Sequence, residues 1–331
     1  MPGLRSAAGL PLPYRQRDAE LTFYLHVGAS KTASTTLQGH FFPAHPDLFF
    51  LGKEESTLRN VKRWATPEIF TVVTDINRKN MDYCLDQNTL AAALGYIRLN
   101  NGGRPIVYSY EDICEFTGPS PFEKISRFRN VFGEFGPIRI VMGVRDQVDL
   151  LKSLYLTLHR AEMLRIAGKK LSWYPTFDQY IDINFRYAYG AVLESFRFSI
   201  ILDHYASIFG AENIFVYAFE DLKRDPVSML RSLCRFMGVD ENASCITETA
   251  RARENQHYSA RRYAYLNLRW LVVRGRSIRK LVPAGVKSRF WGWVDSGKGF
   301  NLTPSEAVID RIREFYKVDN EVLARKYGIT L

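Results

Sequence analysis

The chain alternates between short apolar runs and longer segments in which apolar residues recur at helical spacing. The apolar runs predict buried strands over Leu21–Val27, Pro105–Tyr110, Ile138–Val144 and Asn213–Phe219. Helical spacing predicts helices over Asn88–Leu99, Pro121–Phe132, Val148–Ile166, Ala191–Phe209 and Pro226–Met237. This alternation predicts a three-layer α/β fold, in which helices cover both faces of a parallel central sheet.

The last quarter of the chain has a different pattern, because it is mostly helical and basic. Prolines and glycines predict a loop around Trp291 and Trp293, and an amphipathic pattern predicts a final helix over Pro304–Tyr327. The sequence shows no repeat, low-complexity tract or obvious linker. We therefore expect a single domain over 1–331, with a polar leader over 1–20 and a helical basic C-terminal extension over 258–331.

The composition is that of a folded globular protein, with 331 residues of which 46% are hydrophobic. No stretch approaches the roughly 18 consecutive apolar residues that a membrane span needs, and the start of the chain does not resemble a signal peptide. The four cysteines form no CxxC pair, which favours reduced thiols over a disulfide framework or a structural zinc site. These features predict a cytoplasmic protein.

The formal net charge is +10, and it is concentrated in one segment. Residues 251–290 contain eleven lysines and arginines but only one acid, Glu254. A basic face of this kind suits an anionic nucleotide, an acidic glycan or an anionic membrane surface, and by charge alone also a nucleic acid. A peripheral position at a membrane is thus an alternative to a freely cytoplasmic one.

The most informative segment comes at the end of the first predicted strand, where residues 25–38 read LHVGASKTASTTLQ. A buried strand runs into Gly28, a small-residue turn carries Lys31, and Ser34, Thr35 and Thr36 then open a helix. Unpaired backbone N–H groups and the helix dipole at such a start favour a bound phosphate. An ordinary capped turn with a solvated lysine is the alternative. Too few residues separate Gly28 from Lys31 for a Walker A loop.

This segment resembles the 5′-phosphosulfate loop of PAPS-dependent sulfotransferases (PAPS is 3′-phosphoadenosine 5′-phosphosulfate), and in particular that of bacterial and carbohydrate members. The family loop is commonly Pro-Lys-Thr/Ser-Gly-Ser/Thr-Thr, so Ser30 stands where proline is usual and Ala33 where glycine is usual. Because a Cβ atom disfavours positive φ and close phosphate approach, Ala33 predicts weaker donor binding. The resemblance implies that the donor is held by Ser30, Lys31, Thr32, Ala33, Ser34, Thr35 and Thr36.

A second phosphate motif follows the strand Ile138–Val144. Arg145 comes at the carboxyl end of that strand, where open parallel sheets bind ligands, and Ser153 follows about two helical turns later. The pattern resembles the family's 3′-phosphate motif, which implies that Arg145 and Ser153 hold the second phosphate of the donor. The forked donors of arginine suit this role. A surface pair between Arg145 and Asp146 is the alternative.

Two later segments extend the resemblance. Phe219-Glu220-Asp221-Leu222 through Gly238 is similar to a segment whose role in the family is mainly structural. The stretch around Arg253 looks, more loosely, like the basic segment that closes over the donor, which implies that Arg253 is a donor-binding residue. The matches cover the chain from Leu21 to about Ser259, and they imply a fold like that of sulfotransferases and P-loop kinases.

Sulfuryl transfer depends on positioning, on charge stabilisation and on a base that removes the acceptor proton. In the family, the loop lysine stabilises the leaving oxygen and a His or Glu after a neighbouring strand acts as the base. The resemblance therefore implies catalytic roles for Lys31 and Glu111, the latter following the strand Pro105–Tyr110. A helix-start carboxylate is the alternative for Glu111, and Glu54, Glu55 and His45 are further candidate bases. No metal is required.

The sequence thus predicts a sulfotransferase that uses PAPS and sulfates a hydroxyl acceptor on a carbohydrate or glycolipid, with no nucleic acid as a partner. One alternative is a phosphate-loop kinase, which would need Mg²⁺ and a strand-end aspartate, for which Asp146 could be mistaken. The other is a non-enzymatic protein that binds polyanions or a membrane surface through its basic face.

Overall fold

The computed structural model describes residues 21–52, 66–78, 83–116, 119–157, 175–186, 192–252, 259–273, 284–296, 299–300 and 302–331. A five-stranded, all-parallel sheet forms the centre of this part of the chain, in the order β2-β3-β1-β4-β5. Its strands are β1 (Phe23–His26), β2 (Phe49–Phe50), β3 (Ile106–Ser109), β4 (Ile138–Val144) and β5 (Ile214–Ala218). The four predicted strands are confirmed. The two-residue β2 was not predicted, because a pair of residues is too short to form a pattern.

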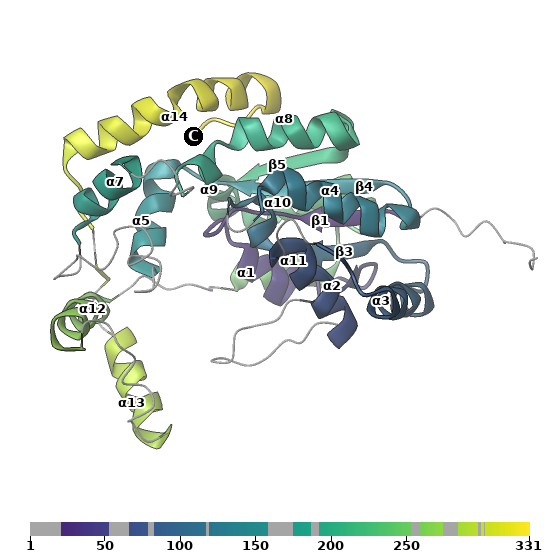
Figure 1. Ribbon diagram of the computed structural model, residues 1–331, viewed down its shortest axis with the longest axis horizontal. Helices are drawn as coiled ribbons and strands as arrows, with labels where there is room; N and C mark the ends of the chain where they lie inside the picture. The colour runs from purple at the N-terminus through teal and green to yellow at the C-terminus, as the bar shows by residue number, and fades with distance from the viewer. Residues whose placement is uncertain are drawn as a thin grey trace, which may run out of the picture.

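Helices make up most of the rest (Figure 1). The longer ones are α2 (Pro67–Arg78), α3 (Gln87–Asn100), α4 (Pro121–Phe132), α5 (Gln147–Thr157), α7 (Phe177–Arg186), α8 (Phe198–Phe209), α10 (Pro226–Met237), α11 (Ser244–Arg251), α12 (Ala260–Val273), α13 (Ala284–Asp295) and α14 (Glu306–Tyr327). Two short ones are α1 (Ser34–Thr36), which continues into a π-helical turn over Leu37–Phe41, and α9 (Phe219–Arg224).

Two predicted helices, α4 and α10, have the boundaries that the sequence indicates, and their caps explain why. Ser120 accepts a hydrogen bond from the Glu123 backbone N–H at 3.2 Å, and Asp225 accepts one from Ser228 at 3.0 Å. In both helices proline occupies the first turn. Gly238 ends α10 in the left-handed conformation, with φ 66°.

Other boundaries differ from the prediction. Helix α8 begins at Phe198, after a short 3-10 turn, and the part of the predicted helix Val148–Ile166 beyond Thr157 lies outside the described residues. The loop predicted around Trp291 and Trp293 is wrong, because these residues belong to α13. Packing against α12 explains the difference: Tyr265 lies edge-on to Trp291, with ring centroids 5.2 Å apart.

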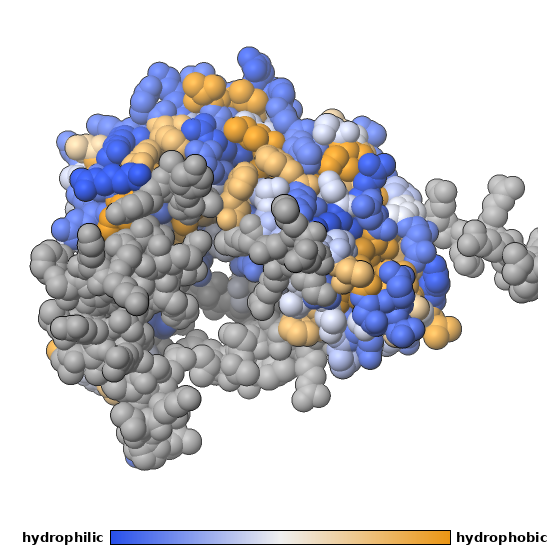
Figure 2. All heavy atoms as spheres, viewed as in Figure 1, coloured by the Kyte–Doolittle hydropathy of each residue, from blue (hydrophilic) through white to orange (hydrophobic). Residues whose placement is uncertain are grey.

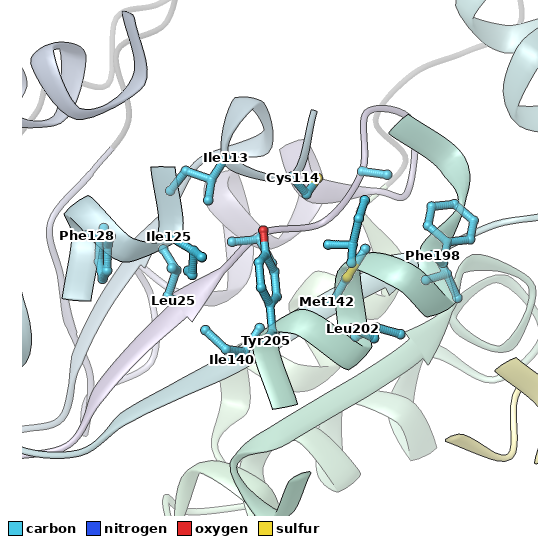
Figure 3. Packing of buried hydrophobic residues seen from close by; sticks show 14 of the residues in the cluster. Leu25, Ile113, Cys114, Ile125, Phe128, Ile140, Met142, Phe198, Leu202 and Tyr205 are labelled. Carbon is cyan, nitrogen blue, oxygen red and sulfur yellow. The ribbon is translucent and has the colours of Figure 1, made fainter. Parts of the chain in front are cut away.

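Alternate residues of the strands pack against two separate helical layers, so the three-layer α/β architecture is confirmed. On one face, Leu25, Ile140 and Met142 lie against α8, whose Leu202 and Tyr205 point toward the sheet (Figure 3). On the other face, Tyr24, Val107, Val141 and Tyr217 pack against the π-helical turn, α9, α10 and α11. The central strands β1, β3 and β4 are therefore buried from both sides.

The end of the chain is part of the larger core. Helix α14 packs beside α8 and α5 (Figure 1), and it buries Val308, Ile312, Tyr316 and Leu323. The surface in Figure 2 is mostly hydrophilic where it is described, with hydrophobic residues in small groups. In the described part of the chain, no helix is both long enough and apolar enough to cross a membrane.

Candidate active site

The loop between β1 and α1 follows the end of β1, so it lies at the carboxyl edge of the parallel sheet, where β1 has β3 and β4 as neighbours. Two of its non-glycine residues have left-handed backbone conformations, Lys31 with φ 74° and Ala33 with φ 66°. Ala33 is the N-cap residue of α1, and no side chain caps this helix start. Glycine, which is usual at this position in the family loop that the segment resembles, adopts the left-handed region without strain.

Contacts within the loop fix its shape. The Thr32 hydroxyl donates to the Ala29 carbonyl oxygen at 2.7 Å, and Thr32 and Ser34 are both buried. A Cβ atom on Gly28 would lie 2.9 Å from both the Thr32 and the Ser34 hydroxyl oxygens, so any larger residue there would displace these two hydroxyl groups. Thr35 and Thr36 are only half-buried.

Arg145 joins the two predicted phosphate motifs. It follows β4, and its Nη1 donates to the Lys31 carbonyl oxygen at 3.1 Å. Its guanidinium carbon lies 4.3 Å from the centroid of the Phe219 ring, and its buried Nε has no hydrogen-bond partner among the described residues. Desolvation lowers the pKa of Arg145, yet a guanidinium keeps its charge in proteins. An anionic ligand would satisfy the buried Nε donor of this half-buried cation.

Asp146, the residue after Arg145, caps a helix. Its Oδ1 accepts from the Asp149 backbone N–H at 2.9 Å, and its own N–H donates to Glu220 at 3.3 Å. Half-buried Ser153 lies two turns along the same helix, α5. In the part of the chain that the structure describes, no three His, Cys, Asp or Glu side chains are grouped as metal ligands would be.

Glu111 begins a 3-10 turn two positions after the last residue of β3, at the same edge of the sheet as the loop. Its Oε2 lies 3.5 Å from the Ser30 hydroxyl oxygen, so the predicted base and the predicted donor loop are adjacent. The Ser30 hydroxyl donates its hydrogen bond to a second carboxylate, Glu115. Burial, with Asp112 and Glu111 adding to it, raises the pKa of Glu115 to about 7.

Glu115 was missed at the sequence level, although it follows Glu111 by four residues and faces the serine that replaces the family's proline. Of the other candidate bases, His45 is buried, and its Nε2 lies 3.0 Å from the Asp240 carbonyl oxygen. Its Nδ1 accepts from the Asp47 backbone N–H at 3.3 Å, so both ring nitrogens contact the backbone. The candidates Glu54, Glu55 and Arg253 lie outside the described residues.

The comparisons with known proteins agree with this geometry. The model of the sulfotransferase domain family matches residues 135–281, which include Arg145, Ser153 and the segment after β5. A sulfotransferase from Alicyclobacillus acidocaldarius has a similar fold, with a TM-score of 0.52 at 15% identity over 95% of this chain and 98% of that one. Residues 135–281 thus match a sulfotransferase domain, and the chain has a fold similar to that of a sulfotransferase.

Two further sulfotransferases are more distant. The sulfotransferase domain from the curacin biosynthetic pathway has a TM-score of 0.44 at 15% identity, over 90% of this chain and 97% of that one. A mouse sulfotransferase complexed with PAP, adenosine 3′,5′-bisphosphate, has a TM-score of 0.40 at 10% identity, over 95% and 90% of the two chains. No curated protein sequence matches the chain.

The left-handed conformation of Ala33 leads to the first prediction. Ala33→Gly should raise the free energy of unfolding of this sulfotransferase by about 0.5–1 kcal/mol, because relief of the Cβ clash outweighs the extra freedom of glycine in the unfolded chain. Ala92→Gly, at an exposed position within α3, should lower it by about 1 kcal/mol. Urea unfolding measures both, and a loss of stability in Ala33→Gly would contradict the prediction.

The raised pKa of Glu115 leads to the second prediction. In the unfolded chain this carboxyl returns to a pKa of about 4.5, so between about pH 4.5 and 7 the unfolded state loses its proton first. The free energy of unfolding of the wild-type protein should therefore fall over this interval relative to that of Glu115→Gln, by up to about 3 kcal/mol. Urea unfolding at pH 5 and pH 8 tests this, and a difference that is equal at both pH values would contradict it.

Proposed function

We propose that this sulfotransferase transfers the sulfuryl group of PAPS to a hydroxyl on a carbohydrate or glycolipid acceptor. The observation that carries the proposal is the hydrogen bond from Arg145 to the Lys31 carbonyl oxygen, because it joins the two segments that resemble the 3′-phosphate motif and the 5′-phosphosulfate loop. One donor nucleotide carries both anionic groups. The unsatisfied Nε of Arg145 and the uncapped start of α1 support a doubly anionic ligand at this edge of the sheet.

In the proposed reaction, residues 30–36 and Arg145 with Ser153 bind the two phosphate ends of the donor. Lys31 stabilises the charge that develops on the phosphate oxygen as its bond to sulfur breaks. Glu111 removes the proton of the acceptor hydroxyl, and its position beside Ser30 supports this role. Glu115 is a second candidate base, because its pKa of about 7 is close to the value that general-base catalysis favours at neutral pH.

The donor site is tested by calorimetric titration of the full chain with PAP in EDTA. The wild-type protein should bind PAP without metal, and Arg145→Ala should weaken binding by about 1.5–3 kcal/mol, the value of a charged hydrogen bond. Lys31→Ala should weaken it as well. Arg139→Ala is the matched control, since this arginine lies at the opposite end of β4, where it bonds Asn213 and the Phe236 carbonyl.

The outcomes separate the candidate functions. Equal losses in the two arginine variants would contradict the site at Arg145, and a requirement for Mg²⁺ would favour the kinase alternative. If PAP binds as expected, a screen of carbohydrate and glycolipid acceptors identifies the substrate. Glu111→Gln then serves as the inactive variant in that screen, and Glu115→Gln shows whether the second carboxylate is also needed.

The surface formed by α12 and α13 supports an acceptor at a membrane. Helix α13 exposes Phe290 and Trp293, the latter with 56% of its surface accessible, and the Arg261 guanidinium lies 5.0 Å from the Trp293 ring centroid. Exposed aromatic rings beside arginines suit the headgroup region of an anionic bilayer. A cytoplasmic enzyme peripheral to the membrane is consistent with the free thiols of the four cysteines.

Vesicle sedimentation tests this surface. The protein should bind vesicles that contain phosphatidylglycerol more strongly than vesicles of phosphatidylcholine alone, and added salt should weaken the binding. Trp293→Ala should reduce it several-fold, by loss of buried aromatic area. Leu99→Ala on α3, where the leucine is 86% exposed, is the control and should bind as the wild type does. Equal binding to both vesicle types would contradict the proposal.

A further inference from the structure

A chain of polar side chains lies on the β1, β3 and β5 face that packs against the π-helical turn, directly below the donor loop. His26 in β1 is almost fully buried, and its Nδ1 lies 2.6 Å from the hydroxyl oxygen of Ser109 in β3. Its Nε2 lies 3.1 Å from the hydroxyl oxygen of Tyr217 in β5. Gln38, in the π-helical turn, and Thr32, in the loop, complete the chain at its two ends.

The hydrogen bonds at the two ends of the chain have a known direction. The Gln38 amide donates to the Ser109 hydroxyl oxygen at 2.8 Å, so the Ser109 hydroxyl is free to donate to Nδ1 of His26. At the other end the Tyr217 hydroxyl donates to the Thr32 carbonyl oxygen at 3.2 Å, so it accepts from His26. A tautomer of His26 with its proton on Nε2 fits both of these contacts.

A glycine makes this chain geometrically feasible. Tyr217 lies in β5 and His26 in β1, and β4 runs between the two strands. Gly143 of β4 pairs with Tyr217, and a Cβ atom there would lie 2.5 Å from the Tyr217 hydroxyl oxygen and 2.8 Å from that of Thr32. Because Gly143 has no side chain, the Tyr217 ring can cross β4 and stack on the His26 ring. The centroids of the two rings are 6.2 Å apart, and their planes differ by 11°.

We infer that Tyr217 and His26 are positioning residues for the donor, which hold the Thr32 carbonyl group and thereby keep the 5′-phosphosulfate loop in its binding conformation. This inference rests on the proposed donor site. Thr32 lies between the two left-handed residues, Lys31 and Ala33, whose conformations cost free energy that contacts around the loop must offset. A loop that is already held in shape loses less conformational entropy when the nucleotide binds.

The same chain sets the position of the donor loop relative to the base. Ser109 is the last residue of β3, and Glu111 follows it by two positions. The register of the sheet pairs Ser109 with His26, the residue after which the chain enters the donor loop. Movement of either strand end would lengthen the hydrogen bonds of the chain, so the chain resists any change in the distance between Glu111 and Lys31.

The experiment compares two buried tyrosines in PAP titrations of the full chain. Tyr217→Phe removes the hydrogen bond to Thr32 and should weaken PAP binding roughly three- to tenfold, as for a neutral hydrogen bond. Tyr24→Phe is the matched control, because the Tyr24 hydroxyl donates to the Met237 carbonyl oxygen at 2.9 Å, away from the loop, and packs in the same cluster. Both variants should have similarly lowered melting temperatures, and Tyr24→Phe should bind PAP as the wild type does.

A second variant tests whether the chain acts as a unit. Ser109→Ala removes the hydroxyl group that contacts His26, at a position that does not itself bond Thr32. This variant should also weaken PAP binding. The double variant Ser109→Ala/Tyr217→Phe should lose less affinity than the sum of the single losses. Wild-type affinity in Tyr217→Phe, equal losses in the two tyrosine variants, or additive losses in the double variant would overturn the inference. Failure of the wild-type protein to bind PAP would instead reject the proposed donor.

Discussion

The shape of the proposed donor loop depends on two consecutive carbonyl groups, which accept hydrogen bonds from one side chain directly after β4 and one side chain within β5. Arg145 at the end of β4 binds the carbonyl of Lys31, and Tyr217 of β5 binds that of Thr32. Lys31 and Ala33 have conformations that side chains with a Cβ atom disfavour, so the loop would relax without these two anchors. Arg145 is at once a proposed ligand for phosphate and a structural support for the loop. The conformations of the two proposed phosphate motifs therefore depend on each other.

The two faces of the sheet stabilise the protein in different ways. The face toward α8 is lined by apolar side chains, whereas the face toward α10 and α11 also carries the chain from Gln38 to Thr32. Polar groups taken out of water destabilise a fold unless they are fully hydrogen-bonded. The links of this chain have consistent directions, so it can lie beneath the loop at little cost and fix its position more sharply than apolar packing would.

The strands and the best-capped helices could be predicted from the sequence because their signals are local. The apolar run that forms β4 and the proline and glycine that bound α10 need no knowledge of the rest of the chain. The motifs around Lys31 and Arg145 were equally visible, and in the structure Arg145 donates a hydrogen bond to the Lys31 carbonyl oxygen. Glu115 and Tyr217 could not be found in this way, because their importance arises from contacts across 85 and 185 residues of sequence. The helix α13 was missed for a related reason, since its glycines are outweighed by packing on α12.

The glycine in β4 has a consequence for redesign of this enzyme. The space above Gly143 is filled by a ring that belongs to the neighbouring strand, so the identities of residues 143, 217 and 26 are not independent choices. A donor loop transplanted from a relative into this protein would not match the side chains of residues 217 and 26 that support the present loop. Conversely, this loop moved alone into another scaffold would lose its anchors. The smallest module that can be exchanged between such enzymes is thus the loop together with the strand segments beneath it.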